Sequence, residues 1–252
     1  MKKSILSLVL AIVFSANAES ANKNTNSNAD LPKISSEWEA QHFLDSDEFE
    51  AKDKEVYSCY EKESNKKKCR EVLKDWHNLC KRGDNKYCIG AFVIASNLFE
   101  QNINAMDKER AILEKSCNSG YGASCFSMIF YQIRLDEKNT SRVLSVAKKI
   151  FLYLQKACDL DFSSGCARLA DLYAAGKRDI ESQEKKEHQN DLERALLKKF
   201  ATTLQKIDKA QVQRYLDKAL AIATRDCDAG EKRACEMVEK YQKIQPKIDS
   251  IK

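Results

Sequence analysis

Apolar side chains recur every three or four residues over most of the chain, in runs separated by short polar loops. In residues 156–173 one such run ends at Cys158 and a second begins at Cys166, with Gly165 in the connection. A recurrence of three to four residues is the period of an amphipathic helix. The pattern therefore predicts two helices joined by a tight connection, with a cysteine in the last turn of the first helix and another in the first turn of the second.

The eight-residue interval between these two cysteines occurs elsewhere in the chain. It is repeated at Cys80/Cys88, Cys117/Cys125 and Cys227/Cys235, and a longer form at Cys59/Cys69 accounts for the last of the ten cysteines. The first cysteines of successive pairs stand 37 residues apart (80 to 117) and 41 residues apart (117 to 158). Self-similarity at this period is typical of repeat proteins. No segment shows sustained strand-like alternation, so we expect an all-α stack of helical hairpins.

Several element boundaries follow from the same pattern. A first helical region is predicted over about 38–60, and a helix that opens at Cys69 is expected to run on to Cys80. The helix that opens at Cys166 is predicted to end at Gly176, because glycine is a common C-terminal signal. Residues 187–226 are interpreted as two helices, the second capped by Asp208, with one long helix as the alternative. The last helix is expected to stop near Pro246.

The N-terminal residues have the features of a secretory signal peptide over 1–18. Lys2 and Lys3 precede an apolar run over 5–14, and Ala16-Asn17-Ala18 forms a small-x-small site with predicted cleavage after Ala18. The apolar run is half the length of about 20 residues that spans a bilayer. Residues 19–35 are predicted to be a flexible leader and 36–252 the repeat domain. We expect a soluble protein in the periplasm or outside the cell.

The charge balance argues against nucleic acids and membrane surfaces as partners. The formal net charge is +5, which falls to +3 without Lys2 and Lys3 of the predicted signal peptide, and acids and bases are interspersed. The three histidines, His42, His77 and His188, are scattered, and no two cysteines have the close spacing of zinc ligands. We therefore predict no metal, no other cofactor and a monomer.

Export changes the expected chemistry of the cysteines, because thiols in an oxidising compartment form disulfides. A disulfide requires Cα atoms about 4.4–6.8 Å apart, which the end of one helix and the start of its antiparallel partner satisfy. Ten cysteines permit many connectivities, and the spacing favours pairing each cysteine with its neighbour in the chain. The predicted structural bridges are Cys59–Cys69, Cys80–Cys88, Cys117–Cys125, Cys158–Cys166 and Cys227–Cys235.

The segment KACDLDFSSGCARLADLY, with Gly176 just beyond it, resembles the Sel-one-like repeat, a relative of the tetratricopeptide repeat. It is most similar to the cysteine-rich secreted branch typified by the Helicobacter cysteine-rich proteins. KSCNSGYGASC and RDCDAGEKRAC carry the same resemblance, whereas Cys59/Cys69 and residues 190–224 depart from it. The resemblance implies a right-handed α/α superhelix (a solenoid) with a concave groove for proteins or peptides. It also implies penicillin binding or weak β-lactamase activity as an alternative.

The chain offers little support for that catalytic alternative. Ser64-Asn-Lys-Lys67 and Ser182-Gln-Glu-Lys185 match the first element of a serine β-lactamase, but the sequence holds neither a Lys-Thr-Gly nor a Ser-Asp-Asn element. Disulfide pairing would leave no cysteine as a nucleophile. We assign no catalytic residue, and resemblance alone supports an enzyme.

Binding of a protein or peptide partner is the favoured function, with an immunity or inhibitor protein as a narrower version and a structural role in the envelope as another alternative. Aromatic residues on the predicted helices are candidate anchors for the partner, although aromatics at helical spacing are more often inter-helix core. The candidates are Phe126, Phe130, Tyr131, Phe151, Tyr153, Tyr173 and Tyr215.

Overall fold

The computed structural model describes residues 35–61, 66–98, 106–136, 143–183 and 208–251, and every regular element within these ranges is a helix. The predicted all-α class is confirmed. The helices are α2 (Ser36–Leu44), α3 (Asp47–Glu61), α4 (Lys66–Lys81), α5 (Asn85–Leu98), α6 (Asp107–Asn118), α7 (Gly122–Asp136), α8 (Val143–Asp159), α9 (Ser163–Gln183), α11 (Lys209–Asp228), α12 (Lys232–Gln242) and α13 (Gln245–Asp249).

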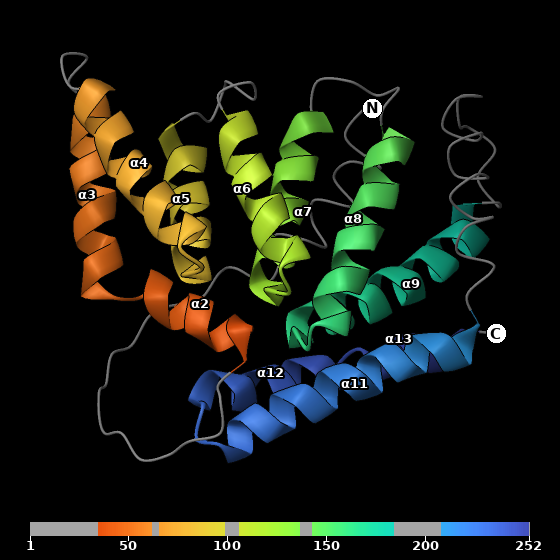
Figure 1. Cartoon of the computed structure of the whole chain (residues 1–252). Coiled ribbons are helices and arrows are strands. Elements are labelled where there is room, and N and C mark those ends of the chain that lie inside the picture. Colours follow the sequence, from red (N-terminus) through yellow and green to blue (C-terminus); the bar gives the residue numbers. More distant parts are fainter. Residues whose placement is uncertain (1–34, 62–65, 99–105, 137–142, 184–207, 252) are drawn as a thin grey trace.

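The helices form an α-helical solenoid in which neighbours in sequence are neighbours in space. Helices α3 to α9 pack one on the next, and α11 packs between α9 and α12. Figure 1 shows α3 to α8 standing side by side, with α11 and α12 running crosswise below the lower ends of the later helices. Helix α2 departs from this order, because it contacts α5 and α7 as well as the adjacent α3.

Four hairpins of the stack, α4–α5, α6–α7, α8–α9 and α11–α12, share one turn geometry. Each connection has three residues, and the middle one has a positive φ: Gly83 at 99°, Gly120 at 96°, Asp161 at 57° and Gly230 at 96°. In each turn the residue after the middle one donates its backbone N–H to the carbonyl five residues earlier, as Phe162 does to Ala157 at 3.0 Å. This is the Schellman ending of a helix, which places a residue in the left-handed region.

The same four hairpins carry the four disulfides of the described residues. The bridges join Cys80–Cys88, Cys117–Cys125, Cys158–Cys166 and Cys227–Cys235, with Cα–Cα distances of 5.0, 4.6, 4.6 and 4.8 Å. In every case the first cysteine is the second-last residue of its helix and the second cysteine is the fourth of the next. The side chains of Cys59 and Cys69 lie outside the described residues, so their pairing stays a prediction.

Gly165 was predicted to lie in the connection, and this is wrong, because it is a residue of α9. A Cβ atom at this position would stand 2.8 Å from the Cβ of Ala157 and 3.1 Å from the backbone nitrogen of Cys158. Both distances are too short for ordinary contacts. The glycine thus allows the close packing of α9 on α8 at this position, where a larger residue would clash.

The helical region predicted over about 38–60 consists of two helices, α2 and α3. Ser46 causes the break: its hydroxyl accepts the backbone N–H of Phe49 at 3.2 Å and donates to the carbonyl of Phe43 at 2.6 Å. A serine that makes these bonds ends one helix and caps the next. Of the expected core residues in this region, Phe43, Phe49 and Val56 are buried.

The predicted end of a helix at Gly176 is also wrong. Helix α9 continues through this glycine to Gln183. A glycine lowers helix stability by about 1 kcal/mol but does not end a helix that is followed by helix-forming residues. The predicted cap at Asp208 is confirmed, since its carboxylate accepts the backbone N–H of Gln211 at 2.6 Å. Whether residues 187–207 form a helix lies outside the described residues.

Near the C-terminus, α12 ends before Pro246, which then stands in the first turn of the short helix α13. Proline is compatible with a first helical turn because the N–H it lacks has no partner there. Ile248 of α13 is fully buried, and Lys247 pairs with Asp171 of α9 at 2.5 Å. The C-terminal residues are therefore part of the packed stack of helices, which we call the array.

The aromatic residues considered as anchors lie between neighbouring helices. Phe126 stacks on Phe162 with ring centroids 4.9 Å apart, and Tyr173 stacks on Phe151 at 4.9 Å and on Tyr215 at 6.0 Å. This packing favours the alternative that they are inter-helix core. No helix within the described ranges combines the length and apolar character that crossing a bilayer requires.

Candidate functional site

Helix α2 lies across the turn ends of successive hairpins, near the first residues of α5, α7, α9 and α12 (Figure 1). Through this placement, the polar groups of α2 contact residues that are 82 to 189 positions further along the chain. We call the array residues that meet its polar groups the α2-binding surface. They are Tyr121, Ala123, Ser163, Ser164, Asp226, Glu231 and Arg233, and we add Tyr241, whose hydroxyl bonds those of Ser163 and Ser164.

Glu37 makes the most deeply buried of these contacts. Its side chain is 8% exposed, and its carboxylate accepts the hydroxyl of Ser163 at 2.7 Å and the backbone N–H of Ser164 at 3.3 Å. The Ser164 hydroxyl donates to the second carboxylate oxygen. The hydroxyl of Tyr241 lies 3.0 Å from both serine oxygens. A carboxylate from one end of the chain is thus enclosed by α9 and α12.

The electrostatics of this contact combine an unfavourable and a favourable effect. Burial raises the pKa of Glu37 above its ordinary value of 4.5, while the hydrogen bonds from Ser164 and Ser163 oppose the rise. Burial also raises the pKa of Tyr241, and the nearby Glu37 adds to that effect. Ser163 and Ser164 are the first two residues of α9, where the helix dipole is positive and favours an anion. The site is built to hold one carboxyl group.

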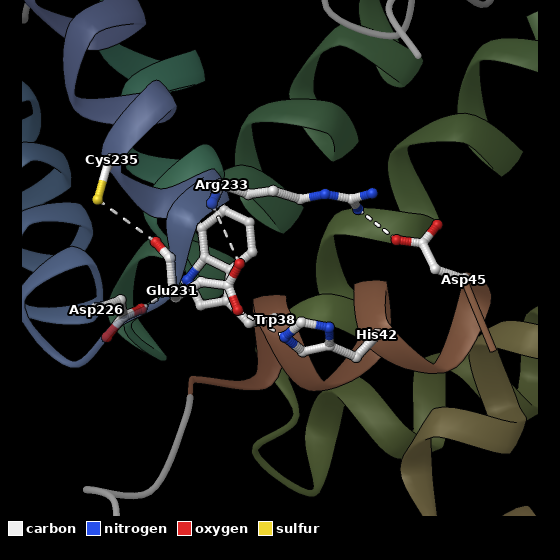
Figure 2. A network of polar contacts seen from close by, with 7 residues as sticks. All are labelled: Trp38, His42, Asp45, Asp226, Glu231, Arg233 and Cys235. Carbon is white, nitrogen blue, oxygen red and sulfur yellow. Dashed lines mark hydrogen bonds and ion pairs between the residues drawn. The ribbon is translucent and has the colours of Figure 1, made fainter. Parts of the chain in front are cut away.

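Trp38 makes the next contact along α2, shown in Figure 2. Its indole N–H donates to the carboxylate of Asp226 at 2.9 Å, and the two side chains are 4% and 5% exposed. Arg225 pairs with the same carboxylate at 2.9 Å. A buried carboxylate needs such donors to offset its loss of hydration. The indole of α2 therefore supplies part of what stabilises Asp226.

Two further pairs link α2 to the start of α12 (Figure 2). Nε2 of His42 donates to the carboxylate of Glu231 at 2.6 Å, and the guanidinium of Arg233 pairs with Asp45, which follows α2 directly. His42 is 57% exposed, so this pair borders solvent. Ion pairs in such positions contribute little to stability, about 0–1 kcal/mol. They favour one orientation of α2 on the surface.

The other end of α2 is held by aromatic packing. The ring of Phe43 lies 4.8 Å from that of Tyr87 and 5.5 Å from that of Trp76, measured between centroids. Toward α7, Tyr121 donates its hydroxyl to Glu39 at 3.2 Å, and Ser36, the first residue of α2, accepts the backbone N–H of Ala123 at 3.3 Å. The helix thus makes polar contacts along its length, and Phe43 adds an aromatic contact to α4 and α5.

The two Ser-x-x-Lys matches set aside in the sequence analysis do not belong to this site. Ser64 and Lys185 lie outside the described residues, and so do the side chains of Ser182 and of Lys66. Lys67 is exposed on α4. The two described histidines have different environments. His42 lies on α2, and His77 is buried with its Nε2 3.4 Å from a carboxylate oxygen of Glu109. Among the described residues, no group of three or more potential metal ligands gathers.

The Ser163 hydroxyl of the α2-binding surface is not accessible to a substrate. Ser163 is fully buried, and its oxygen is occupied by Glu37 and Tyr241. A nucleophile needs access to its substrate as well as a base. The arrangement is suited to holding a helix by paired donors and acceptors.

Sequence reasoning missed this site, although it contains one of the two tryptophans of the chain. The signal available was Trp38, a large aromatic residue in the first turn of a helix of only nine residues. Comparison with protein-family models, with curated proteins and with solved structures finds no match to this chain. Its function is therefore inferred from its own geometry.

Proposed function

We propose that this protein is an exported bacterial scaffold of the Sel-one-like repeat type that binds a protein or peptide partner in the periplasm or outside the cell. The observation that carries the proposal is the position of α2, a short helix held across the turn ends of successive hairpins by side-chain contacts. Such a surface accommodates a peptide helix and presents paired polar groups to it.

The disulfides support the proposed compartment. Four bridges in one chain are expected in an oxidising environment and are rare where glutathione keeps thiols reduced. The signal peptide predicted over 1–18 would deliver the chain there. Cleavage after Ala18 is tested by N-terminal sequencing of the protein recovered from the periplasm.

Crosslinking in the intact cell envelope tests the scaffold role directly. We expect a crosslinked species that contains this chain and a specific second protein, and that disappears when the chain is reduced before crosslinking. Recovery of the chain alone, from cells in which it is folded and oxidised, would contradict the proposal.

The same purified protein can be incubated with a fluorescent penicillin and a chromogenic cephalosporin. The scaffold role predicts neither labelling nor turnover. Labelling that survives denaturation would instead support the penicillin-recognising alternative and locate its nucleophile.

A further inference from the structure

Helix α2 is a separable element of the fold. It has nine residues, far fewer than the roughly 12 to 15 at which an isolated helix becomes even marginally stable in water. It is joined to α3 through only Asp45 and Ser46. Its helical form therefore depends on the surface on which it lies, as does that of a peptide ligand that folds on binding.

Helix α2 both accepts hydrogen bonds from the stacked helices and donates hydrogen bonds to them. Glu37, Glu39 and Asp45 of this segment meet donors of the array, namely the Ser163–Ser164 pair, Tyr121 and Arg233. Conversely, Trp38 and His42 donate to Asp226 and Glu231 of the array. This pattern of charge and hydrogen bonding specifies an occupant: a helix with a carboxylate, an adjacent indole donor and an aromatic residue one to two turns later.

The contacts are also unlike those that hold the hairpins together. No covalent bond links α2 to the α2-binding surface among the described side chains, and most of the links are hydrogen bonds that water or another ligand can replace. If α2 leaves, Ser163 and Ser164 lose the carboxylate to which they donate, and Asp226 loses the indole donor of Trp38. A purely apolar segment would replace none of these hydrogen bonds, which disfavours it as a replacement.

We propose that α2 is an intramolecular occupant of a peptide-binding site, and that a partner helix bearing the Glu-Trp pair followed by a phenylalanine docks on the α2-binding surface in its place. This inference rests on the proposed scaffold function and adds the chemistry of the partner. Partner binding is weakened by the fraction of molecules in which α2 is seated. Opening begins at the Glu37 end, because Phe43 and the connection to α3 hold the other end.

The probe for this proposal is a fluorescein-labelled peptide of residues 35–46, SSEWEAQHFLDS, with blocked ends, measured by fluorescence anisotropy against the oxidised mature chain. The opened variant is Glu37→Ala with Trp38→Ala. The control is Gln41→Ala on the same helix, whose side-chain amide donates to Asp45, the residue after α2, and not to the α2-binding surface. We expect the opened variant to bind the peptide at least about tenfold more tightly than the wild type and the control do.

Specificity is tested with a second peptide that carries the two alanines itself. It should bind the opened variant about tenfold more weakly than the native peptide. Equal binding of both peptides, or binding of neither to an opened variant with an intact helical spectrum and all its disulfides, would overturn the proposal.

Hydrogen exchange on the unaltered chain keeps the test decisive if the opened variant does not fold. Excess native peptide should speed exchange of the amides of α2 while those of the first turn of α9 stay protected. Unchanged exchange in α2 at saturating peptide would show that the peptide does not displace this helix, and would overturn the proposal. A wild-type dimer with exchanged α2 helices, detected by light scattering, would also overturn the proposal, because the occupant would then be a second copy.

Failure of the peptide experiments can be distinguished from failure of the proposed scaffold function. Envelope crosslinking detects a partner at any surface of the protein. A captured partner together with failure of the peptide experiments would remove only the inference about α2.

Discussion

The turn ends of the hairpins and the α2-binding surface occupy the same side of the molecule but are stabilised differently. Cys158 and Cys166 join α8 and α9 covalently and are almost completely buried, over a sequence separation of eight residues. Glu37 and Trp38 reach their partners across 126 and 188 residues and are held by hydrogen bonds. The hairpins are therefore built to remain closed, whereas α2 is seated by contacts that can be exchanged.

The largest effect should come from reducing the disulfides. A bridge that closes a loop of this size contributes about 2.5 kcal/mol on the chain-entropy model. Four bridges then amount to on the order of 10 kcal/mol, compared with a net stability of about 5–15 kcal/mol for a typical domain. We expect full reduction to unfold the chain, seen as loss of the helical circular dichroism signal. A cooperative thermal transition in the reduced, alkylated chain would contradict this.

The order of reduction provides an internal control. Cys227 and Cys235 are partly exposed, whereas the cysteines of the other three bridges are buried. Because thiol–disulfide exchange requires access to the sulfur, Cys227–Cys235 should be reduced first under mild reductant. Alkylation followed by mass spectrometry identifies the order.

The close approach of α8 and α9 gives the next largest expected effect. Gly165→Ala places a methyl group 2.8 Å from the Cβ of Ala157, and the neighbouring backbone of Cys158 restricts any adjustment. Overpacking of this kind costs about 1–3 kcal/mol. Urea unfolding measures the loss. Gly176→Ala in the same helix is the matched control and should stabilise by about 1 kcal/mol through helix propensity.

The left-handed turn residues should show a smaller and purely conformational effect. Gly83 has φ of 99°, and no described atom lies within 4 Å of a Cβ added there. Gly83→Ala is therefore expected to cost about 1–2 kcal/mol from backbone strain alone. Asparagine adopts this conformation more readily, so Gly83→Asn should cost less. Equal unfolding midpoints for the two variants in urea would count against this account of the turn.

The smallest effect concerns the pH dependence of α2 docking. Burial raises the pKa of Glu37 above 4.5, so the folded protein holds this proton more tightly than the unfolded chain does. The resulting stabilisation is complete below about pH 4.5 and is lost as the pH rises through the raised pKa of the folded state. Glu37→Gln removes this titration, and its stability should fall less over that window than that of the wild type.

Urea unfolding and hydrogen exchange of α2 at a series of pH values measure this difference. Glu39→Gln is the matched control, since Glu39 belongs to the same helix but is exposed. A pH profile of Glu37→Gln that parallels the wild-type profile would show that Glu37 does not titrate in this way.

The sequence predicted the hairpins well because their determinants are local. Two cysteines eight residues apart, between two helical patterns, require a tight antiparallel pair, and four such pairs are bridged in the structure. A glycine or aspartate three residues after the first cysteine of each pair marks the left-handed turn position. This regularity would have corrected the placement of Gly165.

The position of α2 was not predictable by the same means. Trp38 and Asp226 are 188 residues apart, and nothing in the local pattern around either one specifies the other. The break before α3 had a local signal, since Ser46 precedes an acidic helical turn, but the surface on which α2 lies depends on how the hairpins stack. Periodicity identifies helices and does not determine which distant helix covers a given end of the array.

The eight-residue span of the bridges has a consequence for the order in which the molecule is assembled. A chain emerges from its N-terminus during synthesis and transport, and contacts close in sequence can form as soon as both partners are free. Each hairpin can thus form before the residues after it are available. Helix α2 precedes its partners Asp226 and Glu231 by 188 and 189 residues. Its docking is then the last step of assembly, and until that step the α2-binding surface is open.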